Sequence, residues 1–148
     1  MKPKTIRITR TCSVPPDRVL AAATDFSDHR PEIFPNVSTR YMTVHSVGDT
    51  TADVREGTRQ GPLYAWERCD YDWSTPGSVT LTITESDTLQ PGGYLTLTAT
   101  THVAGGSAVH GEWEQTSKNL SGLIAVAMMR FIGPRLLSSY YKKVYDGL

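Results

Sequence analysis

The sequence has few of the features that mark the special classes of protein. It contains 2 cysteines in 148 residues, Cys12 and Cys69, with no CxxC pair and no Cys/His cluster at metal-binding spacing. A disulfide framework and a structural metal site are therefore not expected, and neither is a bond between these two cysteines. Because the opening residues, MKPKTIRITR, include no apolar signal region, we expect free thiols in a reducing cytoplasm.

An excess of charge of one sign is also missing. Lys and Arg together number 15, as do Asp and Glu, so the formal net charge is zero. Without a basic field to attract a polyanion, a nucleic acid is not an expected partner. The sequence shows no internal repeat and no phosphate-binding loop, so we expect no cofactor and a single domain over residues 1–148.

Long hydrophobic runs are absent except near the C-terminus. Residues 120–132, LSGLIAVAMMRFI, are apolar on nearly every side, but Gly122 and Arg130 interrupt them. The run is shorter than the about 18 to 20 residues that cross a bilayer, so we expect no stable membrane insertion. We expect instead one long terminal helix whose apolar part is covered by the sheet that precedes it, with a kink or break at Gly133-Pro134.

Alternating apolar and polar residues indicate strands over most of the remaining chain. Residues 5–12 alternate strictly, a proline-led helix is expected at residues 17–24, and residues 25–36 leave room for one more short helix. From residue 39 the period is two, most sharply in residues 78–84, SVTLTIT. The expected order is a strand, two short helices, six strands and a long helix, which is an α+β arrangement.

This order predicts a cavity. A twisted antiparallel sheet with one apolar face must close or wrap around something, and the terminal helix is the only element long enough to be wrapped. A sheet curled around a helix leaves a mostly apolar space that suits small molecules. The faces expected to point at the helix are Val79/Leu81/Ile83, Leu95/Leu97/Ala99 and Val109/Trp113.

Several segments, taken in order, resemble the START-like helix-grip superfamily (SRPBCC), in particular its polyketide cyclase/dehydrase branch. They are residues 14–37 (VPPDRVLAAATDFSDHRPEIFPNV), residues 66–72 (WERCDYD) with a following Pro-Gly turn, the Gly105-Gly106 turn and the terminal helix. The resemblance implies a helix-grip fold, in which a curved antiparallel sheet of about seven strands wraps around a long C-terminal helix. It also implies a hydrophobic cavity, which the superfamily uses for lipids, plant hormones, aromatic metabolites and polyketide chains.

The resemblance further implies which side chains face this cavity. It turns Trp66, Arg68, Asp70 and Asp72 inward, together with Val109, Gly111 and Trp113. The chain departs from the aromatising cyclases in three places. It has Asp72 in place of a pocket arginine, Val37 in place of a pocket tyrosine, and Arg30 in place of a tryptophan. Their particular chemistry is therefore not carried over.

Ten residues are candidates for contact with a ligand: Phe34, Trp66, Arg68, Asp70, Leu81, Ile83, Leu97, Trp113, Met128 and Phe131. Arg68 is the candidate polar anchor, because an inward guanidinium needs a carboxylate or a polar ligand group. Glu56 or Asp70 would serve equally well as a structural partner. A two-residue loop at Gly61-Pro62 would instead set Arg55 opposite Arg68, and the sequence leaves this register open.

Three residues are candidates for catalysis: Arg68 as a stabiliser of an enolate oxygen, His29 as a general base near the cavity mouth, and Glu56. The other histidines, His45, His102 and His110, are expected on the solvent side.

The leading functional prediction is the binding of a hydrophobic, partly aromatic small molecule. One alternative is a polyketide cyclase/aromatase-like enzyme that folds a reactive poly-β-keto chain in the cavity. The other is a lipid-transfer or protein-interaction module whose residues 123–129, LIAVAMM, are partly exposed. Coverage of residues 124–129 by the sheet would argue against the last alternative. The oligomeric state stays open.

Overall fold

The computed structural model describes residues 5–60, 63–131 and 133–148. Strands and helices follow one another in nearly the predicted order. They are β1 (Ile6–Cys12), α1 (Pro16–Ala23), α2 (Arg30–Ile33), β2 (Val37–Val47), β3 (Thr51–Gln60), β4 (Leu63–Asp72), β5 (Ser78–Ser86), β6 (Tyr94–Thr101), a 3-10 turn η1 (Val103–Gly105), β7 (Ser107–Glu114), α3 (Leu120–Phe131) and α4 (Gly133–Asp146).

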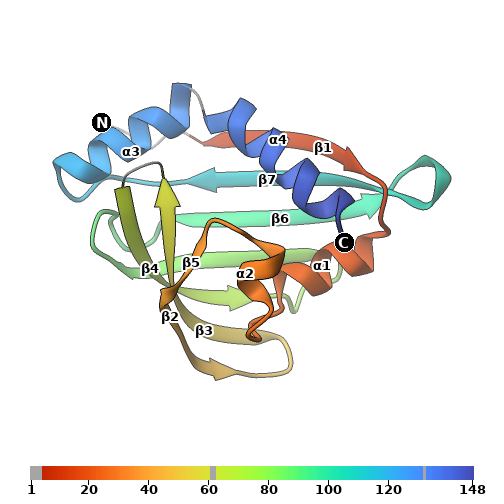
Figure 1. Cartoon of the computed structure of the whole chain (residues 1–148), viewed down its shortest axis with the longest axis horizontal. Coiled ribbons are helices and arrows are strands. Elements are labelled where there is room, and N and C mark those ends of the chain that lie inside the picture. Colours follow the sequence, from red (N-terminus) through yellow and green to blue (C-terminus); the bar gives the residue numbers. More distant parts are fainter. Residues whose placement is uncertain (1–4, 61–62, 132) are drawn as a thin grey trace.

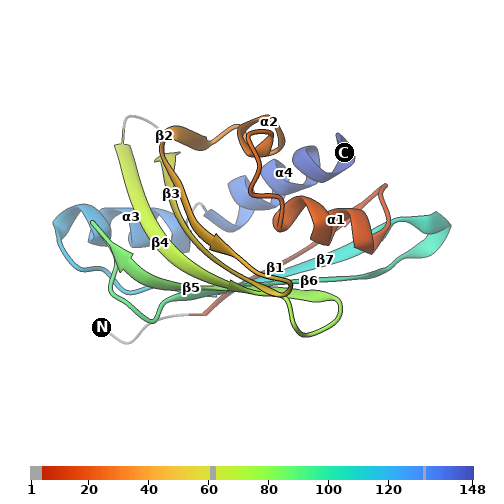
Figure 2. The same cartoon turned by 90° about the horizontal axis from the view of Figure 1, so that it is seen from below.

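The strands form one antiparallel sheet of seven strands, in the order β1-β7-β6-β5-β4-β3-β2. Strands β2 to β7 are a meander in which each strand pairs with the next, and β1 pairs with β7 at the far edge. Seen from below, the sheet curves, and α1, α2 and α4 lie on one side of it (Figure 2). The predicted α+β helix-grip fold is confirmed.

The helices cover this side of the sheet unequally. α4 lies along β1, α1 contacts β5, β6 and β7, and α2 contacts β2 (Figure 1). α1 begins as expected, with Pro16 at a position where the missing amide leaves no helical hydrogen bond unmade.

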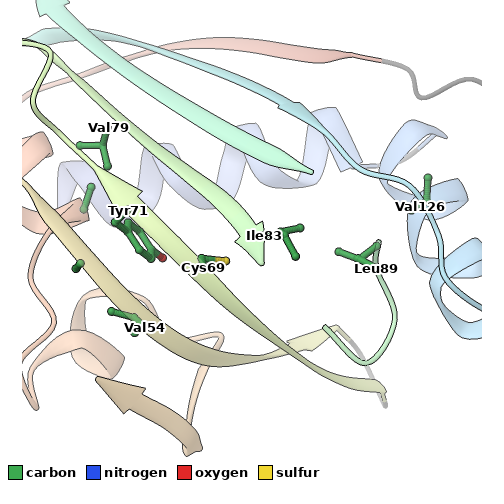
Figure 3. Packing of buried hydrophobic residues seen from close by; sticks show 9 residues of the cluster. Val54, Cys69, Tyr71, Val79, Ile83, Leu89 and Val126 are labelled. Atoms are coloured by element: carbon green, nitrogen blue, oxygen red, sulfur yellow. The ribbon is translucent and has the colours of Figure 1, made fainter. Parts of the chain in front are cut away.

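Two groups of buried side chains hold the layers together. One includes Val54, Cys69, Tyr71, Val79 and Ile83 from β3, β4 and β5 (Figure 3). The other joins residues of β6, β7, α1 and α4 around Val19. Cys12 and Cys69 are both buried and free, which confirms that they are not bonded to each other.

The pairing of β3 with β4 corrects the predicted orientation of β4. Gln60 pairs with Leu63, so Arg55 lies opposite Arg68, which is the register expected for a two-residue loop. Cys69 and Tyr71 are buried in the core. The alternate residues Trp66, Arg68, Asp70 and Asp72 therefore face away from the core, and the prediction that they point into the cavity is wrong.

The terminal helix is divided into α3, which ends at Phe131, and α4, which begins at Gly133. The proline of Gly133-Pro134 lacks the amide needed to continue the hydrogen-bond ladder, which explains the division. α4 takes the place predicted for the long helix, over the sheet, while α3 lies at one end of the molecule (Figure 1).

The prediction that the sheet covers the apolar part of this helix is wrong for the described side chains of α3. Leu120, Leu123 and Ile124 are 72%, 42% and 47% exposed, and only Gly122 and Val126 are buried. Gly122 is buried because α3 docks against the loop after β5, where a β-carbon at this position would lie 1.9 Å from the carbonyl oxygen of Thr88. Within the described residues, no helix is long and apolar enough to cross a membrane.

Candidate functional site

A cavity of about 220 Å³ lies between the sheet and the helices that cover it. Its wall is mostly apolar, and its sheet side comes from residues predicted to face inward: Val79, Leu81, Ile83, Leu95, Leu97, Val109, Gly111 and Trp113. Ala99, from the same predicted set, is buried in the core beside Val109. The cavity predicted between the sheet and the terminal helix is therefore present, and the helix side is formed by α4 through Tyr141 and Tyr145.

A polar cluster centred on Arg30 forms part of the wall. Arg30 is 5% exposed and enters the cavity from α2. Its Nη1 donates to the carbonyl oxygens of Ala23 at 3.2 Å and Asp25 at 3.0 Å, and its Nη2 donates to the Tyr71 hydroxyl at 3.2 Å. Its Nε donates to the Glu56 carboxylate, which also accepts from the Tyr71 hydroxyl at 2.6 Å. This cluster fastens α1 and α2 to β3 and β4.

The charges of this cluster stabilise one another. Burial lowers the pKa of Arg30, but Tyr71 and Glu56 raise it by more, so its pKa lies above the ordinary value. Burial and the neighbouring Glu56 raise the pKa of Tyr71, which keeps its hydroxyl protonated and able to donate. The rings of Phe26 and Phe34 lie 4.8 and 5.1 Å from the guanidinium carbon, and they shield it from water.

Glu67 is the second acidic side chain of the cavity wall. It lies on β4 directly opposite Glu56 of β3. In contrast to Glu56, it makes no hydrogen bond or ion pair within the described part of the chain. Burial, together with the charges of Glu56 and Asp87, raises the pKa of Glu67 to about 7. This carboxyl group therefore changes charge near neutral pH while facing an apolar space.

Trp113 lines the same wall. Its side chain is 4% exposed, and its Nε1 has no acceptor within the described residues. A buried tryptophan N–H ordinarily has a partner. This N–H is itself covered, so it is not part of the cavity surface.

Two tyrosines close the cavity from α4. The rings of Tyr141 and Tyr145 are stacked, with centroids 5.8 Å apart and an interplanar angle of 16°. Burial raises the pKa of Tyr141 to about 12 and that of Tyr145 further. Both phenols are therefore neutral at physiological pH and present aromatic surface to the cavity.

The predicted anchor Arg68 lies outside this cavity. Its guanidinium donates to both carboxylate oxygens of Asp53, at 2.9 and 2.8 Å, on the outer face of the sheet. On the same face, Trp66 packs under Arg55, whose guanidinium carbon is 4.2 Å from the ring centroid, and Asp70 lies opposite Asp53. Arg68, Trp66 and Asp70 are therefore not cavity residues, because the true register turns the alternate set inward.

The predicted catalytic residues are not brought together. Glu56 lines the cavity, but its partners are Arg30 and Tyr71 and not Arg68. The His29 side chain is 72% exposed and pairs with Glu32 at 3.2 Å. That bond raises the pKa of His29, which favours the imidazolium over the free base that catalysis would need.

The remaining predicted ligand contacts divide into two groups. Phe34, Leu81, Ile83, Leu97 and Trp113 all line the cavity. The side chains of Met128 and Phe131 lie outside the described residues.

Arg30, Glu67 and Tyr71 are the site residues that the sequence prediction missed. A signal for two of them was present in β4, where Arg68, Asp70 and Asp72 form a charged alternate set opposite Cys69 and Tyr71. Charged residues at every second position indicate the solvent face, and this would have turned Glu67 and Tyr71 inward. No comparable signal marks Arg30, because it enters from a helix of only 4 residues.

Comparison with solved structures shows the START-like helix-grip fold. The chain is similar to the Zhui aromatase/cyclase from a Streptomyces species, with a TM-score of 0.80, 14% identity, and coverage of 99% of this chain and 93% of that one. It is similar to a START superfamily protein from Mycobacterium smegmatis, with a TM-score of 0.74, 9% identity, and coverage of 97% and 94%.

Norcoclaurine synthase from Thalictrum flavum is also similar, with a TM-score of 0.68, 11% identity, and coverage of 99% and 86%. Comparison with protein-family models and with curated protein sequences gives no match. At these identities the likeness establishes the fold, and the function must be argued from the cavity.

Proposed function

We propose that the protein binds a hydrophobic, partly aromatic small molecule in the cavity between the sheet and α4. The observation that carries this proposal is the wall itself, in which a broad apolar surface surrounds the carboxyl group of Glu67. This carboxyl group has no partner in the part of the chain that the structure describes. Binding sites for small molecules combine apolar walls with a small number of orienting polar groups in this way.

The proposed setting is a reducing cytoplasm, which the two buried free thiols support. The balanced charge supports the expectation that nucleic acid is not a partner.

A cavity-filling substitution tests the proposal. Leu97→Phe places a larger side chain in the cavity, whereas Thr98→Phe adds a ring to the outer face one residue along the same strand. With Nile red as a neutral fluorescent probe, Leu97→Phe should weaken binding by roughly tenfold or more, a change of about 1.4 kcal/mol. Thr98→Phe should leave binding unchanged.

Thermal melts of both variants confirm that they are folded, since overpacking costs about 1 to 3 kcal/mol. If folded Leu97→Phe binds Nile red as tightly as the wild type does, the cavity is not the binding site. Native mass spectrometry of protein purified from its own host would then identify the natural ligand by its mass.

An enzyme of the polyketide cyclase/aromatase kind is the second proposal, and Glu67 is the observation that favours it. A carboxyl group with a pKa of about 7 in an apolar cavity is suited to proton transfer at neutral pH. A poly-β-keto substrate incubated with the protein should then give a cyclised product. Glu67→Gln should reduce the rate of cyclisation while leaving Nile red binding intact.

A lipid-transfer or protein-interaction role is supported by α3. Its side chains Leu120, Leu123 and Ile124 are exposed, which is unusual for three neighbouring apolar residues on one helix. Substituting all three by serine should abolish co-sedimentation with lipid vesicles if this role is correct.

A further inference from the structure

Glu67 has an unusual position among the charged groups of the cavity wall. Arg30 and Glu56 neutralise each other in a closed cluster that includes the Tyr71 hydroxyl. Glu67 projects into the same cavity with no partner among the described residues. A buried carboxyl group without a partner is costly to retain, so its presence in a cavity indicates a group that a ligand completes.

The surroundings of Glu67 favour a cation. Glu56 faces it from β3 and Asp87 from the loop after β5, and both carry negative charge. Cys69 on β4 and Tyr141 on α4 are close enough for Glu67 to affect their pKa values, and both of these groups stay protonated and neutral. Arg30 of α2 is engaged with Glu56. Arg10 lines the cavity from the edge strand β1, four positions from β4 in the sheet order, and has its own interaction.

Trp113 lines the cavity from β7, three strands away from the strand of Glu67 in the sheet order. Its Nε1 has no acceptor among the described residues, but this atom is covered and is not part of the cavity surface. Glu67 is therefore the unpartnered polar group on which the recognition of a ligand is argued.

Building on the proposed small-molecule binding, we propose that the cavity is specific for apolar amines and that Glu67 is the residue that pairs with the ligand's ammonium group. The amine enters as the protonated ammonium ion. Glu67 releases its own proton to solvent and forms a charge-assisted hydrogen bond from the ligand N–H to the carboxylate. No covalent bond is made or broken in this step.

The charges of this wall discriminate between ligands that have the same shape but different polar groups. A neutral alcohol would gain only an ordinary hydrogen bond with Glu67, and a carboxylic acid would add a further negative charge to those of Glu56 and Asp87. Of these three groups, the ammonium group is the one that stabilises the ionised form of Glu67 by its charge.

Three probes that share an indole ring test the proposal: tryptamine, tryptophol and indolepropionic acid. Their affinities are measured by isothermal titration calorimetry at pH 8 for the wild type, for Glu67→Gln, and for the control Glu85→Gln. Glu85 is exposed on the outer face opposite Arg68, so its substitution removes the same charge from the same sheet without touching the cavity.

The wild type should bind tryptamine roughly tenfold or more tightly than tryptophol, in keeping with the strength of a charged hydrogen bond. Indolepropionic acid should bind more weakly than tryptophol. Glu67→Gln should bind tryptamine and tryptophol about equally, and Glu85→Gln should keep the wild-type preference.

Proton release provides a second readout. Titrations near pH 7 in two buffers of different ionisation enthalpy should show protons released on tryptamine binding and none on tryptophol binding. The tryptamine affinity of the wild type should fall by up to about tenfold for each pH unit below the pKa of Glu67. Glu67→Gln should lose both effects.

The outcomes separate this inference from the proposal on which it rests. If tryptophol binds and tryptamine binds no more tightly, or if Glu67→Gln keeps the preference, the assignment of an amine to Glu67 is overturned while small-molecule binding stands. If none of the three probes and no Nile red binds to the wild type, the proposed function fails, and the amine site fails with it.

Discussion

Arg30 is the residue whose substitution should damage the fold most. In Arg30→Ala, the Glu56 carboxylate stays buried without its cation, and the carbonyl groups of Ala23 and Asp25 lose their donors. Removing one partner of a buried ion pair costs about 3 to 5 kcal/mol. Urea denaturation followed by circular dichroism should show a loss of unfolding free energy in this range.

Arg68→Ala is the matched control for that measurement. It removes an arginine that is also paired with a carboxylate, but on a partly exposed face, where such pairs contribute about 0 to 1 kcal/mol. If the two variants lost the same unfolding free energy, the conclusion that Arg30 is buried in the interior while Arg68 lies on the outer face would be contradicted.

Glu67 should make the stability of the protein fall as the pH rises. Its pKa is raised from an ordinary value of 4.5 to about 7. Its favourable contribution to folding is therefore complete below pH 4.5 and is lost as the pH rises through about 7. The loss at higher pH is roughly 3 kcal/mol, since each pKa unit corresponds to about 1.4 kcal/mol.

Glu67→Gln removes this loss. The variant should be more stable than the wild type at pH 8 and close to it at pH 4, as measured by urea denaturation at each pH. Taking the difference from the wild type cancels the acid-side effects of the paired carboxylates Asp53 and Asp146, whose pKa values are lowered. A pH-independent difference between Glu67→Gln and the wild type would show that the carboxyl group does not titrate abnormally.

The sequence could predict cavity residues where apolar alternation is strict, and it could not where charges interrupt the pattern. β5 and β6 alternate leucine, isoleucine and valine with threonine, so Leu81, Ile83 and Leu97 were predicted correctly to face inward. β4 carries a glutamate, Glu67, on its inner face and a tryptophan, Trp66, on its outer face. The resemblance to WE-containing strands therefore favoured Trp66 and every second residue after it as the inward-facing set, which is wrong. Arg30 was missed because the burial of a charge depends on partners from distant segments, Glu56 and Tyr71, that no local pattern brings together.

At the scale of elements, α3 depends on one close approach. Gly122 lets the helix lie against the carbonyl of Thr88, and Asn119 donates to the carbonyl oxygen of Asp87 at 2.8 Å beside it. In Gly122→Ala, the added carbon would clash with backbone, so α3 must move away. A stability loss of about 1 to 3 kcal/mol is expected, as for other overpacked contacts.

Hydrogen exchange followed by mass spectrometry locates this effect. Peptides of α3 should exchange faster in Gly122→Ala, while peptides of β5 and β6 should not change. Ser121→Ala is the control, since this neighbouring residue is exposed and alanine favours a helix. Unchanged protection of α3 in Gly122→Ala would contradict the close contact.

The sequence predicted where the terminal helix is divided, but not which of the two resulting helices covers the sheet. Gly133-Pro134 indicates a break wherever it occurs in a helical pattern. Which of the two resulting helices covers the sheet depends on the contacts that each can make. α4 makes more of them, because Tyr141 and Tyr145 line the cavity and Asp146 accepts a hydrogen bond from the Ser13 amide at 2.9 Å.

At the scale of the whole molecule, the element order was enough to predict the fold. One strand, two short helices, a six-stranded meander and a terminal helix allow few compact arrangements once each apolar face is buried. The chemistry of the cavity was not predictable to the same extent, because it depends on the register between β3 and β4 and on the side chain that α2 contributes. A shift of a single residue in a strand exchanges its two faces.

The pairing of β1 with β7 has a consequence for how the protein is made. Arg7 bonds to Glu112 across 105 positions of the chain, and the tyrosines of α4 come later still. During synthesis, the apolar faces of β5 and β6 therefore emerge well before the elements that enclose them. Ladders between such distant segments form slowly, and a half-enclosed apolar face is prone to aggregate. A molecule that fills the cavity would therefore act on the nascent chain as well as on the folded protein. It would stabilise the state in which α4 covers the sheet over the partly folded state in which the apolar face is still exposed.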